Sequence, residues 1–419
     1  MRPARARQRA VAIAAQPERA DLLELEELLR TAGVAVVATL TQARQHPHPQ
    51  SYLGPGKIAE LKQLATESDA NIVACDDELS PRQERTLEQE LGIAVIDRTA
   101  IILDIFARHA GSAEGKLQVE LAQLEYNLAR MRGLWTHLER LGGGVGTRGP
   151  GETQIETDRR LARNRIATLR RRLGHVQGTR EVMRRERERS RIPQIAIAGY
   201  TNAGKSSLLH ALTGADVPIA DRLFHTLDPA TRALAINGRS YLVTDTVGFI
   251  RKLPHQLVDA FAATLEETRR AELILHVVDV SADDGEREAM IGAVERVLEE
   301  IGAGDVPRLL VLNKSDLLGG ERADAWSGRR DALLLSARTG SGVGELRERI
   351  DAAFVRALEP VELLVPYEEG GRLAELHALA GELHREETLD GVRVTALLPP
   401  ASAARFARYA TSRNGVRET

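Results

Sequence analysis

The sequence predicts an α/β fold in four parts, and three patterns lead to this division. Short apolar runs alternate with helical stretches over residues 1–114, which predicts a small α/β subdomain. Over residues 115–191, apolar residues repeat at heptad spacing on both sides of a glycine-rich segment, which predicts an antiparallel helical hairpin with a glycine-rich tip. A second strand–helix alternation fills residues 192–358, and a short β-α-β-α pattern over residues 359–419 predicts a small α+β domain.

The first part is expected to contain three strands and at least two helices. The strands are the apolar runs Val34–Val37, Ile72–Cys75 and Ile93–Ile96, and a helix is expected over Gly56–Leu64. Ser80-Pro-Arg-Gln83 has the form of a capping box with proline at the first helical position, so a second helix is expected to begin there.

Two runs of apolar residues at alternating spacings of three and four predict the hairpin. The first run is Leu117, Leu121, Leu124, Leu128, Met131, Trp135 and Leu138, and the second is Ala162, Ile166, Leu169, Leu173 and Val176. Two such helices joined by one loop are expected to fold back on each other, and we interpret both runs as core packing. At about 1.5 Å per residue, each arm would reach roughly 40 Å.

The tip of the hairpin and its second arm are the candidate RNA-binding surface. Gly144-x-Gly146-x-x-Gly149 matches a dinucleotide fingerprint, but a helix rather than a strand precedes it, so we interpret it as a loop able to enter a narrow groove. No acidic residue lies between Arg159 and Arg172, and this excess of charge favours contact with the phosphate backbone of structured RNA over a merely solvated face. The predicted RNA-binding residues are Gly143, Gly144, Arg148, Arg159, Arg160, Arg163, Arg170 and Arg171.

The third part opens with a phosphate loop. Residues 199–206 read G-x-x-x-x-G-K-S directly after the apolar run Ile195–Ala198, and a helical pattern follows. The glycines let backbone N–H groups turn towards phosphate oxygens, and the helix N-terminus favours an anion. We expect Lys205 to reach the β- and γ-phosphates and Ser206 to bind Mg²⁺. The predicted nucleotide contacts of this segment are Gly199, Tyr200, Thr201, Asn202, Ala203, Gly204, Lys205, Ser206 and Ser207.

Three further segments follow apolar strands in the order that a P-loop GTPase requires. In Asp245-Thr-Val-Gly248, the aspartate can hold Mg²⁺ through water and the glycine N–H can meet the γ-phosphate. In Asn313-Lys-Ser-Asp316, the last carboxylate can accept the N1–H and 2-amino hydrogens of guanine, a pairing that adenine lacks. The stem of Lys314 can lie along the base, and Asn313 can tie this segment to the phosphate loop. The further predicted contacts are Asp245, Thr246, Val247, Gly248, Asn313, Lys314, Ser315, Asp316, Ser336, Ala337 and Arg338.

The first switch loop is expected between the phosphate loop and Asp245. Thr226 lies there, and its hydroxyl would join Ser206 and Asp245 in binding Mg²⁺ when a γ-phosphate is present. Thr231 is the alternative. Lys205, Thr226 and Gly248 are the candidate catalytic residues.

The residue after Gly248 predicts slow hydrolysis by the protein alone. Ras-like GTPases carry a glutamine there that orients the attacking water, whereas this chain has Phe249. A phenyl ring cannot orient water, so a partner is expected to supply or reorganise the missing element.

Composition limits the remaining classes. The 419 residues are 43% hydrophobic and 28% charged, which is ordinary for globular domains with apolar cores. A single cysteine, Cys75, excludes a disulfide framework and fits a reducing cytosol. The sequence has no apolar stretch long enough to span a bilayer and no C-terminal prenylation signal, which disfavours a membrane-linked signalling GTPase. We therefore expect a cytoplasmic protein. We also expect it to be a monomer.

The last part has no catalytic signature that we recognise. Val361–Val365 and Val392–Leu397 are expected as strands, with a helix from Leu373 to His384 between them.

Five segments together resemble the HflX family of P-loop GTPases. They are Tyr52-Leu-Gly-Pro-Gly-Lys57, Gly149-Pro-Gly-Glu-Thr-Gln-Ile-Glu-Thr-Asp158, Gly199-Tyr-Thr-Asn-Ala-Gly-Lys-Ser206, Phe224-His-Thr-Leu-Asp-Pro-Ala-Thr-Arg232 and Asp245-Thr-Val-Gly-Phe249. The first two lie outside the GTPase domain and are the more specific. The resemblance covers nearly the whole chain.

The resemblance implies a factor that binds GTP and GDP with Mg²⁺ and docks on the large ribosomal subunit and its rRNA. The glycine-rich tip would then reach towards the peptidyl-transferase region. It also implies splitting of stalled or idle ribosomes, with GTP hydrolysis releasing the factor. A ribosome assembly or hibernation GTPase that binds the large subunit without splitting is the alternative. Some members of the family have an ATP-linked activity in the N-terminal part, but Gly54-x-Gly56-Lys57 is too short for a Walker motif.

Overall fold

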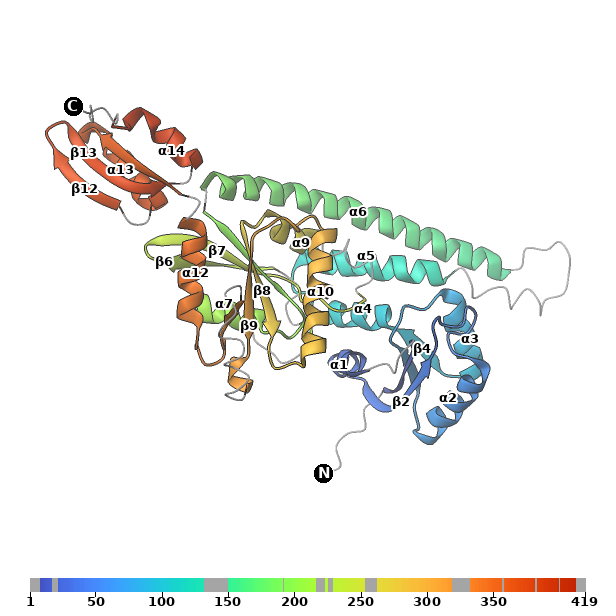
Figure 1. The fold of residues 1–419 in the computed structure, drawn as a ribbon. Helices are drawn as coiled ribbons and strands as arrows, with labels where there is room; N and C mark the ends of the chain where they lie inside the picture. The colour runs from blue at the N-terminus through green and yellow to red at the C-terminus, as the bar shows by residue number, and fades with distance from the viewer. Residues whose placement is uncertain are drawn as a thin grey trace, which may run out of the picture. The chain divides into compact units, whose positions relative to one another are not determined.

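The computed structural model describes most of the chain (Figure 1). The described residues are 8–16, 22–131, 150–190, 192–215, 223–224, 229–252, 262–318, 332–355, 358–380, 383–398 and 400–411, and within the helices the side chains of 150–155, 177–190, 262–264, 378 and 400–402 lie outside the description. The chain divides into two compact units. The first contains Met1–Val182, Ala220–Pro229 and Thr246–Glu266, and the second contains Met183–Ile219, Ala230–Asp245 and Glu267–Thr419.

The first unit is built on a four-stranded parallel sheet. Its strand order is β2-β1-β3-β4, with β1 at Arg9–Gln16, β2 at Ala35–Ala43, β3 at Ile72–Cys75 and β4 at Ala94–Asp97. The apolar side chains of β1 and β3 are buried. Val11, Ile13, Val73 and Cys75 pack with the two helices that follow β2 and β3. An α/β subdomain over this part of the sequence is therefore confirmed.

Four helices surround this sheet. They are α1 (Leu23–Thr31), α2 (Pro55–Glu67), α3 (Pro81–Leu91) and α4 (Arg98–His109). Residues of α2 and α3 share one buried apolar cluster with β1 and β3, while α1 and α4 contact each other. The capping box at the start of α3 is present: the Ser80 hydroxyl accepts from the Gln83 N–H at 3.3 Å, and the Gln83 side chain accepts from the Ser80 N–H at 2.9 Å.

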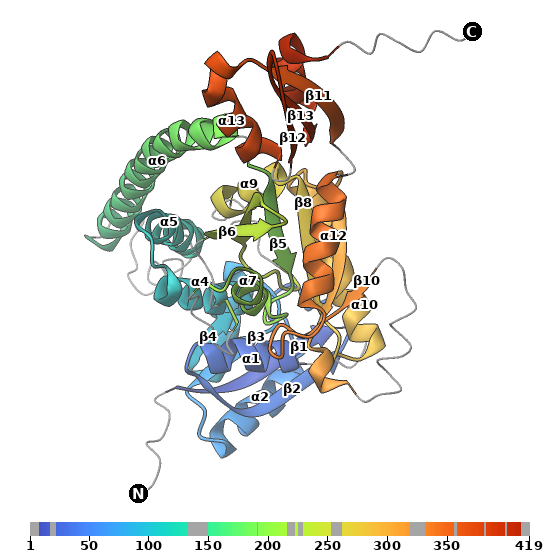
Figure 2. The same cartoon turned by 90° about the vertical axis from the view of Figure 1, so that its left-hand side faces the viewer.

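Helices α5 (Ala113–Arg130) and α6 (Pro150–Ser190) lie side by side as a hairpin (Figures 1 and 2). On α6 four of the five expected apolar residues are buried, with Ala162, Ile166, Leu169 and Leu173 each 8% exposed or less, whereas Val176 is half-buried.

The first arm differs from the expectation of a single heptad seam. The leucines of α5 are only half-buried, and its most buried large side chains are Val119 and Tyr126. The hydroxyl of Tyr126 donates to Asp97, at the end of β4, at 2.8 Å. A helix with neighbours on two sides buries two stripes, and the heptad pattern accounts for only one of them.

The second unit contains a six-stranded sheet of order β10-β9-β8-β5-β7-β6. Its strands are β5 (Gln194–Gly199), β6 (Ala230–Ile236), β7 (Arg239–Asp245), β8 (Leu273–Asp279), β9 (Arg308–Asn313) and β10 (Ala332–Leu334). Only the pairing of β6 with β7 is antiparallel among these strands. The carboxyl ends of β5, β7, β8 and β9 therefore share one edge, which is where open α/β sheets bind ligands.

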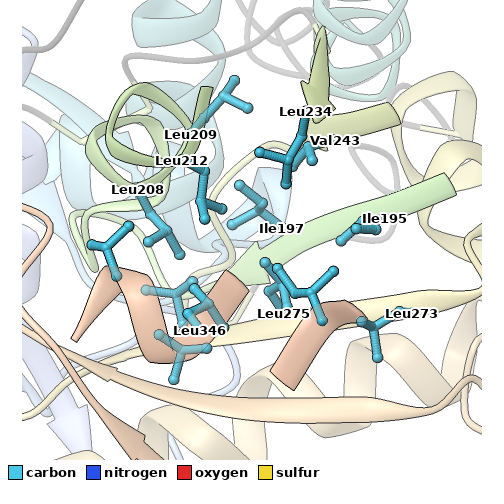
Figure 3. Packing of buried hydrophobic residues seen from close by; sticks show 14 of the residues in the cluster. Ile195, Ile197, Leu208, Leu209, Leu212, Leu234, Val243, Leu273, Leu275 and Leu346 are labelled. Atoms are coloured by element: carbon cyan, nitrogen blue, oxygen red, sulfur yellow. The ribbon is translucent and has the colours of Figure 1, made fainter. Parts of the chain in front are cut away.

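Helices cover both faces of this sheet. On one face, α7 (Lys205–Thr213) and α12 (Val343–Val355) pack Leu208, Leu212 and Leu346 against Ile197 and Leu275 (Figure 3). On the other face, α10 (Asp284–Glu300) packs against the β8 and β9 strands. Helix α9 spans Ala262–Arg270, and the short 3₁₀ helix η1 spans Ser315–Leu317. This is the expected P-loop GTPase fold.

The C-terminal part forms a separate three-stranded antiparallel sheet of order β11-β13-β12. Its elements are β11 (Glu359–Val365), η2 (Tyr367–Glu369), α13 (Gly370–Ala380), β12 (Leu383–Thr388), β13 (Gly391–Leu398), α14 (Pro400–Phe406) and η3 (Ala407–Tyr409). The expected helix to His384 was too long, because it ends at Ala380 and His384 lies in β12. That strand was missed since most of its side chains are charged and exposed, so it lacks an apolar alternation. Among the described residues, no helix is both long and apolar enough to cross a membrane.

Candidate nucleotide site

Two glycines of the phosphate loop have no room for a side chain. A Cβ on Gly199 would lie 2.2 Å from the carbonyl oxygen of Val277, on the neighbouring strand β8. Gly204 has φ of +90°, and a Cβ there would lie 2.2 Å from Nδ2 of Asn313. The first glycine thus permits close packing of β5 on β8, and the second permits the turn into α7. Asn202, between them, also has a positive φ of 61°.

Lys205 begins α7 and folds back over the loop. Its ammonium donates to the carbonyl oxygens of Tyr200 at 2.9 Å and Gly199 at 3.2 Å, and the residue is 7% exposed. Burial lowers the pKa of Lys205 to about 8, and the nearby carboxylate of Asp245 opposes this shift. A cation is therefore held against the loop whose N–H groups would face phosphate.

Ser206 and Asp245 bring together two oxygen ligands of the kind that Mg²⁺ prefers. The Ser206 hydroxyl donates to Oδ2 of Asp245 at 2.7 Å, and Asp245 is fully buried at the end of β7. Within the described residues there is no cluster of three or more His, Cys, Asp or Glu side chains that could hold a metal. Mg²⁺ is commonly bound by one or two protein oxygens together with phosphates and water, so this pair fits such an ion.

Asn313 braces the phosphate loop against the segment after β10. Its Nδ2 donates to the carbonyl oxygen of Ala203 at 2.8 Å, and its Oδ1 accepts from the N–H of Ala337 at 2.9 Å. The residue is 2% exposed. The bond to Ala203 joins the Asn313–Asp316 segment to the phosphate loop, and the bond from Ala337 adds a contact with the segment after β10.

The carboxylate of Asp316 is also held in place. Its Oδ1 accepts from the Ser336 hydroxyl at 2.6 Å, and the guanidinium of Arg338 lies 4.0 Å from its Oδ2. The backbone N–H of Ser315 donates to the carbonyl oxygen of Leu335 at 3.1 Å. A carboxylate fixed in the 3₁₀ helix that follows β9 can accept two hydrogens from one edge of a base.

The remaining predicted contacts are placed as follows. Tyr200, Thr201 and Ala203 are buried, and Ser207 is half-buried in the first turn of α7. In the first unit, Thr246 and Val247 are buried, as is Gly248. The side chain of Phe249 is 2% exposed, so it offers neither a polar atom nor access to water.

The two candidate threonines of the first switch differ in what is known of them. Thr226 lies outside the described residues. The hydroxyl of Thr231 lies 3.0 Å from that of Thr244, so it takes part in the pairing of β6 with β7. This engagement weakens Thr231 as the alternative metal ligand.

The basic arm α6 has partners that the sequence did not reveal. Arg165 and Arg170 pair with Glu120 and Glu125 of α5, at 2.6 and 2.8 Å. The excess charge of α6 is therefore offset in part by the neighbouring helix. The side chains of Arg160, Arg163 and Arg171 are exposed, Arg159 is half-buried, and Gly143, Gly144 and Arg148 lie outside the described residues.

Sequence reasoning missed several polar residues near the switch and base segments. In the first unit, Nζ of Lys252 lies 3.0 Å from Oδ2 of Asp76, and Arg98 donates to the carbonyl oxygen of Arg251 at 3.1 Å. No local sequence pattern predicts these contacts. In the second unit, Asp279 pairs with Lys314 at 2.6 Å. Here a signal existed, because Asp279 ends an apolar strand just as Asp245 does.

Comparison with known proteins agrees with this geometry. Residues 19–107, 109–187 and 194–314 match the family models described as "GTP-binding GTPase N-terminal", "GTP-binding GTPase Middle Region" and "50S ribosome-binding GTPase". The "GTPase HflX" of Caldanaerobacter subterraneus is 48% identical over 86% of this chain and 83% of its own length. Those of Lacrimispora saccharolytica and Escherichia coli are 45% and 46% identical over 94% and 88% of this chain, and 93% and 87% of their own lengths.

The chain belongs to the HflX family of GTPases. The resemblance found in the sequence is thereby confirmed, and so is the P-loop GTPase fold. As an HflX GTPase, the protein hydrolyses GTP to GDP and phosphate. The roles of the individual site residues stay predictions.

Proposed function

We propose that this HflX GTPase is a GTP-dependent factor that docks on the large ribosomal subunit, splits stalled or idle ribosomes and hydrolyses GTP to leave. The observation that carries the proposal is a nucleotide site on the same chain as an exposed basic helix face. The relatedness of residues 194–314 to a family described as a "50S ribosome-binding GTPase" supports it. We propose that the protein is cytoplasmic and monomeric. We also propose that its four parts are divided after residues 114, 191 and 358.

In the proposed nucleotide site, the chain provides charge for the phosphates and a carboxylate for the base. We propose that Lys205 turns from the loop carbonyls that it contacts here to the β- and γ-phosphates. The N–H of Gly248 is assigned to the γ-phosphate. Asp316 accepts the two guanine hydrogens, and the braces from Ser336 and Asn313 fix its position relative to the loop.

Mg²⁺ would be held by Ser206 directly and by Asp245 through water, with Thr226 joining when the first switch closes. The close approach of the Ser206 hydroxyl to the Asp245 carboxylate supports this assignment. Bound there, the ion supplies positive charge that stabilises the leaving phosphate oxygens.

Stimulation by the large subunit follows from Phe249. Because this buried phenyl ring cannot orient water, the chain alone lacks the group that positions the nucleophile in Ras-like enzymes. We propose that docking on the subunit reorganises this region and accelerates hydrolysis.

The contact with rRNA is assigned to the tip and to the exposed face of α6. Arg160, Arg163 and Arg171 are exposed there, whereas Arg170 is paired with Glu125. Exposed arginines that neutralise phosphates release counterions, so binding should weaken steeply as salt rises.

The test is the sedimentation profile of intact ribosomes mixed with the protein and a slowly hydrolysed GTP analogue. Separation into subunits supports splitting. Co-sedimentation with the large subunit while ribosomes stay intact would instead favour a role in ribosome assembly or hibernation. Arg163→Gln with Arg171→Gln should lower binding and flatten its salt dependence. Arg296→Gln with Arg385→Gln removes the same charge from exposed positions elsewhere and should change neither.

A further inference from the structure

The aspartate that ends β8 lies beside the lysine of the N-K-S-D segment. Asp279 and Asn313 are partners in the register of β8 and β9, and the N–H of Val280 donates to the carbonyl oxygen of Asn313 at 3.0 Å. The two strand ends are therefore fixed to each other. Across them, Oδ2 of Asp279 lies 2.6 Å from Nζ of Lys314.

The second oxygen of Asp279 is held by the turn that follows β8. Its Oδ1 accepts from the N–H of Ser281 at 2.9 Å and from the Ser281 hydroxyl at 2.6 Å. The carboxylate cannot rotate without losing these bonds. The side chains of Asp279 and Lys314 are 20% and 26% exposed, so water screens their attraction less than that of a fully exposed pair.

Lys314 also has an unusual backbone. Its φ of 68° lies in the left-handed region, which is disfavoured for residues other than glycine, and η1 with Asp316 begins directly after it. Such a conformation persists only where the surroundings enforce it. The ion pair with Asp279 fixes the far end of the same side chain.

We propose that Asp279 is a positioning residue for guanine recognition. It anchors the ammonium of Lys314, so that the four-carbon stem stays in place along the plane of the base that Asp316 binds. An anchored stem has already lost its rotamer freedom, whereas a free lysine would lose that freedom when nucleotide binds. This proposal rests on the binding of guanine at Asn313–Asp316.

The test is Asp279→Asn in the full chain. Asparagine has the same size and keeps an oxygen for the two bonds from Ser281, but it removes the charge that holds Lys314. Affinity for GDP should fall about fivefold, mainly through faster dissociation. In a Lys314→Met background, which keeps an unbranched apolar stem without the ammonium, Asp279→Asn should have no further effect. Asp305→Asn is the matched control, since it removes the same charge from an exposed position before β9.

Two comparisons separate this proposal from the guanine site itself. Inosine diphosphate lacks the 2-amino group, so Asp279→Asn should weaken it and GDP equally, whereas Asp316→Asn should reduce the preference for GDP. Unchanged GDP affinity in Asp316→Asn would overturn the guanine site. If Asp316→Asn weakens GDP but Asp279→Asn does not, the positioning role alone is refuted. The positioning role is also refuted if Asp279→Asn weakens GDP binding equally in the chain with Lys314 and in the Lys314→Met variant.

Discussion

Replacing Asn313 by alanine tests whether the phosphate loop and the base segment are organised as one site. The substitution removes a donor to Ala203 and an acceptor for Ala337, at 2.8 and 2.9 Å, from a position that is 2% exposed. Each buried hydrogen bond contributes about 1 kcal/mol net, so about 2 kcal/mol of organisation is lost. If that organisation serves binding, affinity for both GDP and GTP should fall roughly 30-fold.

The assay is equilibrium titration of the full chain with GDP and with GTP, alongside thermal unfolding. Asn237→Gly is the matched control. Asn237 also donates one side-chain hydrogen bond, to Asp351 at 3.0 Å, and glycine readily adopts its φ of 48°. It lies in the turn between β6 and β7, so nucleotide affinity should not change. If Asn313→Ala lowered the unfolding temperature while both affinities stayed within about threefold, the brace would serve stability alone.

Three further outcomes follow from buried charged or titratable groups. Only the ammonium form of Lys205 attracts phosphate, and burial lowers its pKa to about 8. GTP affinity should therefore fall about tenfold per pH unit above pH 8, and titration calorimetry should show proton uptake on binding. An affinity that stays constant up to pH 9.5 would contradict this. Burial lowers the pKa of His276 to about 4, so this side chain stays neutral in the native state, whereas the unfolded chain protonates it near pH 6.5. About 3 kcal/mol of the free energy of unfolding should therefore be lost as the pH falls from 6.5 to 4. In His276→Leu, the denaturant midpoint should depend less on pH over that range. Arg98 is 2% exposed and pairs with Asp76 at 2.7 Å. Arg98→Met should therefore lower the free energy of unfolding of the first unit by about 3 kcal/mol. Arg349 pairs with Glu345 at a more exposed position, so Arg349→Met should cost less than about 1 kcal/mol in the same unfolding assay.

The parts of the site that the sequence predicts are those defined by local backbone geometry. The glycines of the phosphate loop are required by a positive φ and by close packing, and both constraints act on residues at fixed spacing. The strand-end position of Asp245 and of Asn313 likewise follows from the apolar run before each. These features could be found because the strand, the turn and the helix are adjacent in the sequence.

The missed features join residues that are distant in sequence. The partner of Arg170 is Glu125 on the other arm of the hairpin, so the apparent excess charge of α6 is misleading when that helix is considered alone. Helix α5 has one buried stripe, which contains Val119 and Tyr126, and one half-buried stripe of leucines. Both depend on which elements pack beside the helix, and a heptad pattern reveals one neighbour at most. Strand β12 is held by its pairing with β13 rather than by apolar alternation of its own.

The most direct test of the central claim is the rate of GTP turnover by the pure protein, with and without isolated large ribosomal subunits. Slow turnover alone and stimulation by orders of magnitude are expected, because docking would complete a site in which Phe249 cannot orient water. Lys205→Ala should abolish the stimulated rate. Unchanged turnover in the presence of large subunits, with GTP binding intact, would contradict the proposed ribosomal function.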